Sequence, residues 1–321
     1  MNPHRVGMLH GGSLGDFVLS WHLLRSVVRA ASARAASVWA RRPMADTDPA
    51  LWGLDELYDA EACGLHGLFA EGNRAPASPV GRLGECDLLI NCLPEEDSAF
   101  SRNLRAIASG PVVCLDPRPL SGSGEHIVRQ WSARLGDAGV GSGAVQPARL
   151  LLERGKVEQA RARLESMSGA KSGRTVLIHP GSGGRAKCWA LANYLELAGR
   201  LRSAEITSVF VIGPVEEDLF TEQERGVLSR WPTIRSLSLT ELAALSAAAD
   251  LCVCNDSGFG HLAAASGTRV LSIFGATAPS VWRPLGRRVH VAGRAGHWPT
   301  WAEVLECVRT SLGEDRWPQR G

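Results

Sequence analysis

A rhythm of strand and helix runs through this chain twice, and no other feature of the sequence constrains the fold as strongly. Short apolar runs lie at residues 5–9, 36–39, 86–91 and 111–115, and again at 175–179, 207–212, 251–254 and 269–274. Between them lie segments with apolar residues at helical spacing, at 16–31, 189–202, 216–229, 240–249 and 257–266. Such alternation is typical of a parallel sheet flanked by helices.

Chain length and the weakly patterned segments predict the domain organisation. At 321 residues the chain exceeds the usual size of one hydrophobic core, so we predict two doubly wound α/β domains. Two such domains facing each other enclose a cleft at the carboxyl ends of their strands. The small, polar stretch 169–173 follows a charged helical segment at 153–166 and predicts the linker. The expected domains are 1–168 and 169–296, and the closing segment 297–321 contains an amphipathic helix at 301–312.

The first of three glycine-rich turns, residues 11–16, lies between the first predicted strand and the first helix. It reads Gly-Gly-Ser-Leu-Gly-Asp. Glycines let the backbone turn tightly near a ligand, and the helix after them presents unpaired N–H groups. The spacing does not fit G-x-G-x-x-G, because position 10 is His. Asp16 has two interpretations: a carboxylate that complements the helix dipole, or a general base beside a cleft.

The second turn, residues 179–189, also follows a predicted strand and reads His-Pro-Gly-Ser-Gly-Gly-Arg-Ala-Lys-Cys-Trp. Its backbone N–H groups and Ser182 are suited to holding a diphosphate. It is not a Walker A loop, because the G-K-[ST] ending is absent. Lys187 is one of only three lysines in the chain, against 32 arginines. This scarcity favours a specific role on a diphosphate over that of a solvated loop cation.

The third turn, residues 254–262, carries a strand end into a short helix and reads Cys-Asn-Asp-Ser-Gly-Phe-Gly-His-Leu. Asp256 or Ser257 is a suitable N-cap. The first-turn N–H groups and the helix dipole would then face a phosphate. His261, one turn into the helix, is either a ligand contact or a hydrogen-bonded core histidine.

In order and spacing, the three turns resemble the motifs of glycosyltransferase family 9, the ADP-heptose:lipopolysaccharide heptosyltransferases. The first motif, G-x-L-G-D, is similar to residues 12–16, and the second, P-G-S-G-x-x-x-K-x-W-P, to residues 180–189, with Ala190 in place of the final Pro. The third, N-D-S-G-x-x-H-L-A-A-A-x-G-x-P, is similar to residues 255–267, with Arg269 in place of the Pro. Residues 274–277 resemble the family's F-G-x-T.

This resemblance implies a GT-B fold, in which two Rossmann-like domains face a central cleft and a C-terminal helix crosses back to the N-terminal domain. The N-terminal domain would bind the acceptor and the C-terminal domain the nucleotide-sugar donor. Asp16 would take the proton from the acceptor hydroxyl, and Lys187 would stabilise the leaving diphosphate. Donor contacts are implied for Gly12, Gly15, Gly181, Ser182, Gly183, Gly213, Glu216 or Glu217, Asp256, Ser257, Gly258 and His261.

The resemblance further implies inverting transfer of a sugar, a heptose in this family, from an ADP-sugar to a lipopolysaccharide-core or other glycan acceptor. It implies no cofactor and no metal. Asp46-Thr47-Asp48 spells the D-x-D metal signature of the other major glycosyltransferase fold, but it lacks supporting His or acidic residues, and short acidic pairs arise often by chance. A lipid-linked acceptor would bring peripheral contact with the inner membrane face.

Charge, hydropathy and cysteine usage narrow the class of protein. A formal net charge of +2 gives no basic excess for a nucleic-acid partner. No stretch approaches the roughly 20 apolar residues that span a bilayer, and the four-residue apolar run at 6–9 is too short for a signal-peptide core, so we expect neither feature. Eight scattered cysteines fit a reducing compartment, so we expect a cytoplasmic protein.

Three alternatives stay open on the sequence. A sugar-nucleotide epimerase or hydrolase on the same fold would act on the donor without an acceptor. A non-catalytic member that binds sugar nucleotides or glycans would have lost turnover, although Asp16, Lys187 and His261 are all present. A nicotinamide oxidoreductase is the weakest alternative, because the second predicted strand runs into Arg41 and Arg42 instead of an acidic residue for a ribose.

Overall fold

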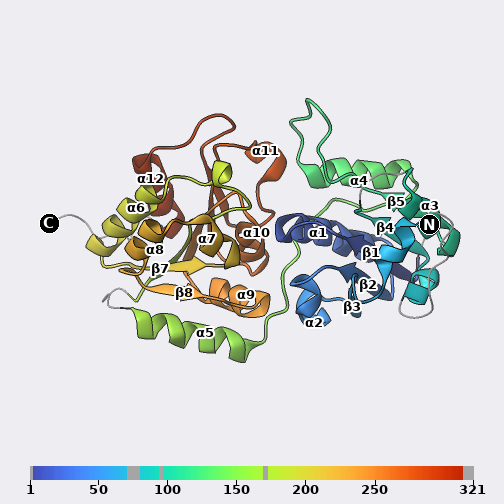
Figure 1. Cartoon of the computed structure of the whole chain (residues 1–321), viewed down its shortest axis with the longest axis horizontal. Coiled ribbons are helices and arrows are strands. Elements are labelled where there is room, and N and C mark those ends of the chain that lie inside the picture. Colours follow the sequence, from blue (N-terminus) through green and yellow to red (C-terminus); the bar gives the residue numbers. More distant parts are fainter. Residues whose placement is uncertain (1–2, 71–79, 94–96, 169–172, 314–321) are drawn as a thin grey trace. The chain divides into compact units, whose positions relative to one another are not determined.

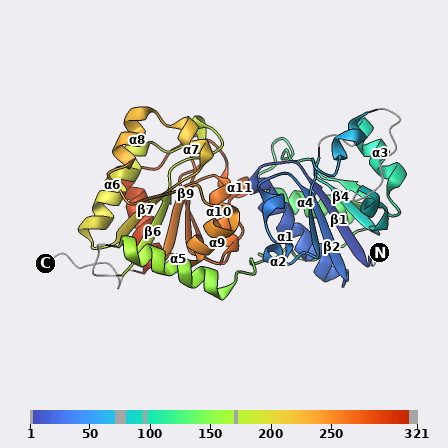
Figure 2. The ribbon, with the colours of Figure 1, turned by 60° about the horizontal axis from the view of Figure 1, so that its bottom comes forward.

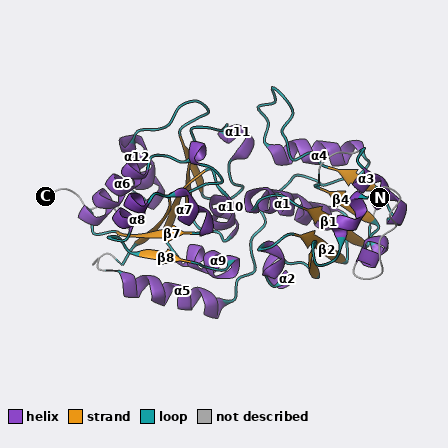
Figure 3. Cartoon of the chain, viewed as in Figure 1, coloured by secondary structure: helices purple, strands orange, loops and turns teal. Residues whose placement is uncertain are grey.

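The computed structural model describes residues 3–70, 80–93, 97–168 and 173–313 (Figure 1). The chain divides into two compact units, Met1–Leu151 and Leu152–Gly321. Each unit contains one parallel sheet with helices packed against it (Figure 3). The predicted pair of doubly wound, Rossmann-like α/β domains is therefore confirmed.

The first unit is built on a five-stranded sheet with the order β3-β2-β1-β4-β5. Its strands are β1 (Arg5–His10), β2 (Ala35–Ala40), β3 (Glu56–Asp59), β4 (Leu88–Asn91) and β5 (Val112–Cys114). Every neighbouring pair is parallel, with Leu9 opposite Asn91 and Asn91 opposite Cys114. The carboxyl ends of β1, β4 and β5 therefore lie side by side. The sequence predicted four of these strands and missed β3, a short edge strand.

The helices of the first unit are α1 (Leu14–Ala30), α2 (Pro49–Trp52), α3 (Ala99–Ile107) and α4 (Ile127–Asp137). Helix α1 buries its apolar face, on which Phe17, Trp21 and Leu24 are each 0% exposed. The Trp21 indole meets Trp52 edge to face at 5.3 Å and donates Nε1–H to the Trp52 carbonyl at 2.8 Å. An aromatic cluster therefore fixes α1 against α2.

The second unit is built on a six-stranded parallel sheet with the order β11-β10-β9-β6-β7-β8. Its strands are β6 (Thr175–His179), β7 (Thr207–Ile212), β8 (Thr233–Arg235), β9 (Leu251–Asn255), β10 (Val270–Ile273) and β11 (Val289–Ala292). The central strands are buried along their whole length, as near-continuous apolar runs require. The edge strands β8 and β11 were not predicted.

The helices of the second unit are α5 (Arg154–Met167), α6 (Leu191–Ser203), α7 (Pro214–Leu219), α8 (Glu222–Leu228), α9 (Leu239–Ala248), α10 (Gly258–Ala265), α11 (Pro279–Trp282) and α12 (Trp301–Leu312). The single helix predicted at 216–229 is wrong. Phe220 is extended, and Thr221 caps a new helix by accepting the Glu224 N–H at 3.2 Å. Among the described residues, no helix is both long and apolar enough to cross a bilayer.

The predicted domain boundary at 168 needs correction. Helix α5 lies alongside α9 (Figures 1 and 2), and its Leu164 is buried in the same core as Leu177 and Val209. The division therefore precedes α5, at Leu151 and Leu152. Most of the predicted linker, residues 169–172, lies outside the described residues.

The expectation that the closing helix crosses back to the first domain is also not met. Helix α12 occupies 301–312 as predicted, but it packs against α6, β10 and β11. Its apolar stripe, Val304, Val308 and Leu312, is buried in the core of the second unit. The amphipathic pattern predicted that one face is covered, but it does not specify which sheet covers it.

Candidate functional site

The loops that follow β6, β7, β9 and β10 meet at one edge of the second sheet. These four strands are neighbours and run parallel, so their carboxyl ends lie together. Ligands of open parallel sheets bind at this edge. The loops contain the second and third glycine-rich turns and the segment 274–277.

Asn255, the last residue of β9, ties this edge together. Its Oδ1 accepts the Trp189 N–H and the Tyr194 O–H, each at 2.9 Å. Its Nδ2 donates to the carbonyls of Pro180, at 2.8 Å, and Gly181, at 3.1 Å. The side chain is 0% exposed and uses all four of these hydrogen bonds on protein groups. Asn255 is thus a structural clamp that fixes the loop after β6 to the end of β9.

A cation, a carboxylate and a hydroxyl meet beside this clamp. Lys187 follows β6 in a short 3₁₀ turn, η4 (Arg185–Lys187), and its Nζ lies 3.7 Å from Asp256 Oδ2. Thr277 donates its hydroxyl to the same Oδ2 at 2.6 Å, and Ser182 donates its hydroxyl to the Asp256 carbonyl at 2.6 Å. The Lys187 side chain is 48% exposed, whereas that of Asp256 is 10% exposed. Asp256 therefore positions the ammonium group of Lys187, and the half-exposed Lys187 side chain remains accessible to a ligand.

The predicted diphosphate loop is shaped by a buried carboxylate. Glu216 lies in α7, is 3% exposed and accepts the Gly213 N–H at 2.8 Å. A side chain at Gly181 would overlap this carboxylate, so only glycine fits there. A Cβ on Gly183 would meet nothing within 4 Å, so its backbone is approachable. Glu216 therefore supports the loop from inside, a role that the sequence did not reveal.

Glu216 also faces a histidine that sequence reasoning did not select. His179 Nε2, at the end of β6, lies 3.6 Å from Glu216 Oε2. Its ring stacks on Phe259 of α10, with centroids 4.8 Å apart and planes at 7°. Burial lowers the pKa of His179, and the Glu216 charge opposes that shift only in part. By packing on Phe259, His179 thus fixes the start of the β6 loop against α10.

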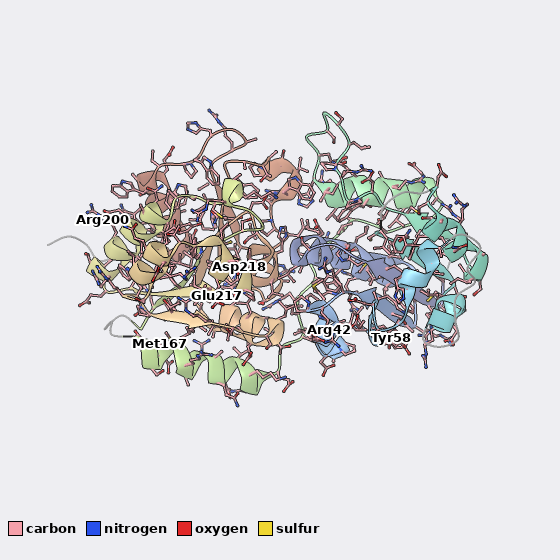
Figure 4. The ribbon with its side chains drawn as sticks, in the orientation of Figure 1. Arg42, Tyr58, Met167, Arg200, Glu217 and Asp218 are labelled. Carbon is pink, nitrogen blue, oxygen red and sulfur yellow. The ribbon has the colours of Figure 1, made fainter. Side chains whose placement is uncertain are left out.

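Glu216 and Glu217, the two alternatives for one implied donor contact, differ in access. Glu216 is 3% exposed, whereas the side chain of Glu217, labelled in Figure 4, is 45% exposed. The Glu217 carboxylate lies 3.5 Å from the Arg235 guanidinium at the end of β8. Glu217 is therefore the one whose carboxylate a ligand can reach.

Helix α10 begins at the same edge. Ser257 is its extended N-cap and supplies no side-chain cap, so the first N–H groups of the helix point outward. Gly258 is the first helical residue, and His261 is buried one turn in. The positive end of the helix dipole therefore lies next to Asp256 and the loop with Lys187.

The remaining predicted residues lie together in the first unit, where β1 passes into α1. The Asp16 carboxylate is half-buried, and its Oδ2 accepts from the Ser13 hydroxyl at 2.8 Å and the Ser13 N–H at 3.3 Å. Asp16 thus stabilises the helix start, which is the structural interpretation given above, while it also lies at the carboxyl edge of the sheet. Gly15 is buried in the first turn of α1.

His10 is the neighbour of Asp16 that sequence reasoning left out of the site. A Cβ on Gly12 would lie 3.1 Å from His10 Cε1 and 3.3 Å from Asp16 Oδ2, so both side chains border this glycine. Burial lowers the pKa of His10 to about 4, although the Asp16 charge opposes the shift. The imidazole beside Asp16 is therefore neutral near pH 7.

The D-x-D sequence has local structural roles. Asp46 pairs with Arg42 at 3.3 Å, and Asp48 caps α2 by accepting the Ala50 N–H at 2.8 Å. Thr47 accepts the Trp52 indole N–H at 2.7 Å. Within the described ranges, no three His, Cys, Asp or Glu side chains are grouped so that they could hold a metal ion.

The fold and the site at the carboxyl edge of the second sheet define the class of protein. Solved structures with the same fold are a glycosyltransferase family 9 protein from Veillonella parvula (TM-score 0.73, 17% identity, 96% of this chain and 97% of that one) and the Escherichia coli ADP-heptose lipopolysaccharide heptosyltransferase II (TM-score 0.70, 20% identity, 97% and 99%). The protein is thus of the GT-B type.

The chain belongs to glycosyltransferase family 9 (heptosyltransferase), whose model matches residues 116–309, more than half of the sequence. A curated relative, lipopolysaccharide heptosyltransferase 3 of Escherichia coli, is 33% identical over 113 residues, which are 34% of this chain. The matched stretch spans 33% of the length of that relative. The resemblance given by the sequence motifs is therefore confirmed at the level of family and fold.

Proposed function

We propose that the protein is an inverting glycosyltransferase that moves a sugar from an ADP-sugar to a hydroxyl of a glycan acceptor. One observation carries the proposal: Lys187, Asp256, Thr277 and the start of α10 meet at the carboxyl edge of the second sheet. A half-exposed cation and a helix N-terminus are the groups that stabilise a leaving diphosphate.

The donor binds at this edge in the proposal. Lys187 Nζ and the backbone of Gly181 and Gly183 take the diphosphate, and Ser257 and Gly258 add N–H groups at the positive end of the α10 dipole. Asp256 orients Lys187 and Thr277. Glu217 takes the nucleoside contact, because Glu216 is committed to supporting the loop.

Asp16 is the general base of the transfer. Its carboxylate takes the proton from the acceptor hydroxyl as that oxygen forms a bond to the anomeric carbon. The bond from the anomeric carbon to the diphosphate oxygen breaks, and its electron pair leaves with ADP. This single displacement inverts the anomeric configuration. The neutral His10 beside Gly12 adds no competing positive charge to the base.

No metal takes part in the proposed reaction. The negative charge that develops on the leaving diphosphate is balanced by the ammonium of Lys187 and by the backbone N–H groups of α10 and of the loop after β6. These groups supply the charge stabilisation that a divalent cation supplies in metal-dependent transferases. The proposal therefore predicts turnover that chelators leave unchanged.

Family membership supports the choice of substrates. Its description, heptosyltransferase, and the names of the Escherichia coli proteins favour ADP-heptose as donor and a lipopolysaccharide core as acceptor. We place the enzyme in the cytoplasm, which fits eight free cysteines, with peripheral contact to the inner membrane face when the acceptor is lipid-linked.

Calorimetric titration of the purified protein with ADP, UDP, GDP and NAD, with and without EDTA, tests the donor site. We expect selective binding of ADP that EDTA does not change. Lys187→Ala should weaken ADP binding about tenfold or more, because one charge-assisted contact is lost. Lys156→Ala is the matched control, since Lys156 lies on α5 and pairs with Glu153 at 2.6 Å. It should bind ADP like the wild type.

The other possible binding results would each favour a different function. Preference for UDP or GDP would keep the transfer and exclude an ADP-sugar. ADP binding without turnover on any acceptor would favour a non-catalytic binding protein, and consumption of the donor alone would favour an epimerase or hydrolase. Loss of binding in EDTA would contradict the metal-free mechanism.

A further inference from the structure

A cavity of about 440 Å³ opens at the carboxyl edge of the first sheet, within the size range of small-molecule sites. It lies where β5 ends and α4 begins. Leu93, Leu115 and Ile127 supply its apolar wall, and charged side chains from the loop after β5 and from α4 surround that wall. None of the sequence motifs includes these residues.

The cavity is held open by buried polar side chains of α4. Gln130 is 8% exposed; its Nε2 donates to the Glu125 carbonyl at 2.7 Å, and its Oε1 accepts the Leu120 N–H at 2.8 Å. Trp131 is 5% exposed and donates Nε1–H to the Asp116 carbonyl at 2.7 Å. These bonds fix the loop over the cavity at both ends. A preformed site of this kind loses little entropy when a ligand binds.

The cavity borders the glycine turn that leads to Asp16, with Leu93 between them. Strand β4 lies between β1 and β5, and the Cys92 N–H after it donates to the Leu9 carbonyl at 2.9 Å. Leu93, which lines the cavity, packs on the glycine turn, since a Cβ on Gly11 would come within 2.5 Å of Leu93 Cδ2. A ligand in the cavity is therefore separated from this turn by the Leu93 side chain, and strand β4 lies between β5 and the strand that leads to Asp16.

Charges around the cavity disfavour an anion. Three carboxylates, of Asp116, Glu125 and Asp137, face two guanidinium groups, of Arg118 and Arg134. Arg118 is engaged with Asp116 through two hydrogen bonds of 3.0 Å, and this contact lowers the pKa of the Asp116 carboxyl. Glu125, Asp137 and Arg134 are all exposed at the rim, so two carboxylates oppose one guanidinium group there. A phosphate entering the cavity would meet a net negative rim.

We propose that this cavity binds the acceptor through a sugar ring that carries neither phosphate nor carboxylate, an assignment that rests on the proposed transfer. The apolar wall matches the C–H face of a pyranose, and the polar rim matches its hydroxyl groups. Selectivity against phosphorylated sugars follows from the carboxylates of Glu125 and Asp137.

Saturation-transfer difference NMR with two matched probes tests the assignment, in the presence of saturating ADP. The probes are methyl α-D-mannopyranoside and its 6-phosphate. We expect the neutral glycoside to bind at least about tenfold more tightly, given like-charge repulsion at the rim. Ala133→Trp fills the cavity from an exposed position on α4 and should abolish this binding. Ala162→Trp, at an exposed position on α5, is the matched control and should not.

The double variant Glu125→Gln with Asp137→Asn removes the two rim carboxylates and should narrow the difference in affinity between the two probes at least threefold. The assignment is overturned if the phosphate binds as tightly as the neutral glycoside to the wild type. It is also overturned if Ala133→Trp binds the glycoside like Ala162→Trp, or if no cavity-dependent binding occurs. ADP affinity, measured in the same samples, separates this result from failure of the proposed function, because Ala133→Trp should bind ADP normally.

Discussion

The buried His22 makes the first unit sensitive to acid, and His22→Gln should remove that part of the sensitivity. His22 lies in α1, is 0% exposed and accepts the Ala148 N–H on Nδ1 at 2.9 Å. Burial lowers its pKa from 6.5 to about 3, with a smaller contribution from His126. Glutamine keeps an acceptor for the Ala148 N–H but does not titrate.

The expected magnitude follows from proton linkage. Below about pH 6.5 the unfolded chain protonates this imidazole, whereas the folded chain keeps it neutral down to about pH 3. The contribution of His22 to stability is therefore complete above pH 6.5 and is lost as the pH falls toward 3. At about 1.4 kcal/mol per pH unit, the loss between pH 7 and pH 5 is about 2 kcal/mol. His10, with a pKa of about 4, adds a similar loss in both proteins.

Hydrogen exchange of the α1 peptides, measured in rising urea and corrected for intrinsic exchange at each pH, reports the opening free energy of the first unit. Wild type should lose about 2 kcal/mol more than His22→Gln between pH 7 and pH 5. His66→Gln, at an exposed position in the same unit, should behave like wild type. Equal losses in His22→Gln and wild type would exclude His22 as a source of the acid sensitivity.

Two further substitutions probe the edge of the second sheet. Asn255→Ala should lower the free energy of unfolding of the second unit by about 2–4 kcal/mol, because the buried Trp189 N–H and Tyr194 O–H lose their acceptor. Urea unfolding measures this loss, and an unchanged midpoint would exclude the structural role of Asn255. Gly181→Ala should weaken ADP binding about tenfold or more, because the new methyl group displaces Glu216. Gly199→Ala, where a Cβ has open space, should leave ADP binding unchanged. Equal ADP affinities in the two variants would exclude Glu216 as a support of the loop.

Much of the fold was predictable because buried parallel strands and amphipathic helices leave periodic patterns. The strands that escaped prediction, β3, β8 and β11, lie at sheet edges and are only three or four residues long. Their patterns are too short to stand out. The position of the domain boundary was predicted wrongly for another reason. Helix α5 is polar on nearly all sides and buries Leu164 alone, so composition does not indicate which sheet it joins.

The candidate site was predictable where function depends on motifs and hidden where it depends on three-dimensional contacts. The motifs placed Lys187 and Asp256 after two predicted strands, and the structure makes these strands neighbours and brings the two side chains within 3.7 Å. The inward direction of Glu216 follows from helix phase and from the absence of a side chain at Gly181, which only the folded chain shows. The cavity of the first unit draws on Leu93, Leu115 and Ile127, which no motif connects.

The most direct test of the account is transfer from ADP-heptose, followed as ADP release that depends on an added acceptor glycan, with Asp16→Asn beside wild type. We expect acceptor-dependent turnover in EDTA, and a loss of about 10²–10⁴-fold in kcat for Asp16→Asn with ADP affinity unchanged. Asp48→Asn, which alters another helix-capping carboxylate of the same unit, should retain full turnover. Equal turnover in Asp16→Asn and wild type would contradict the assignment of the base, and ADP release without sugar transfer would contradict the proposed reaction.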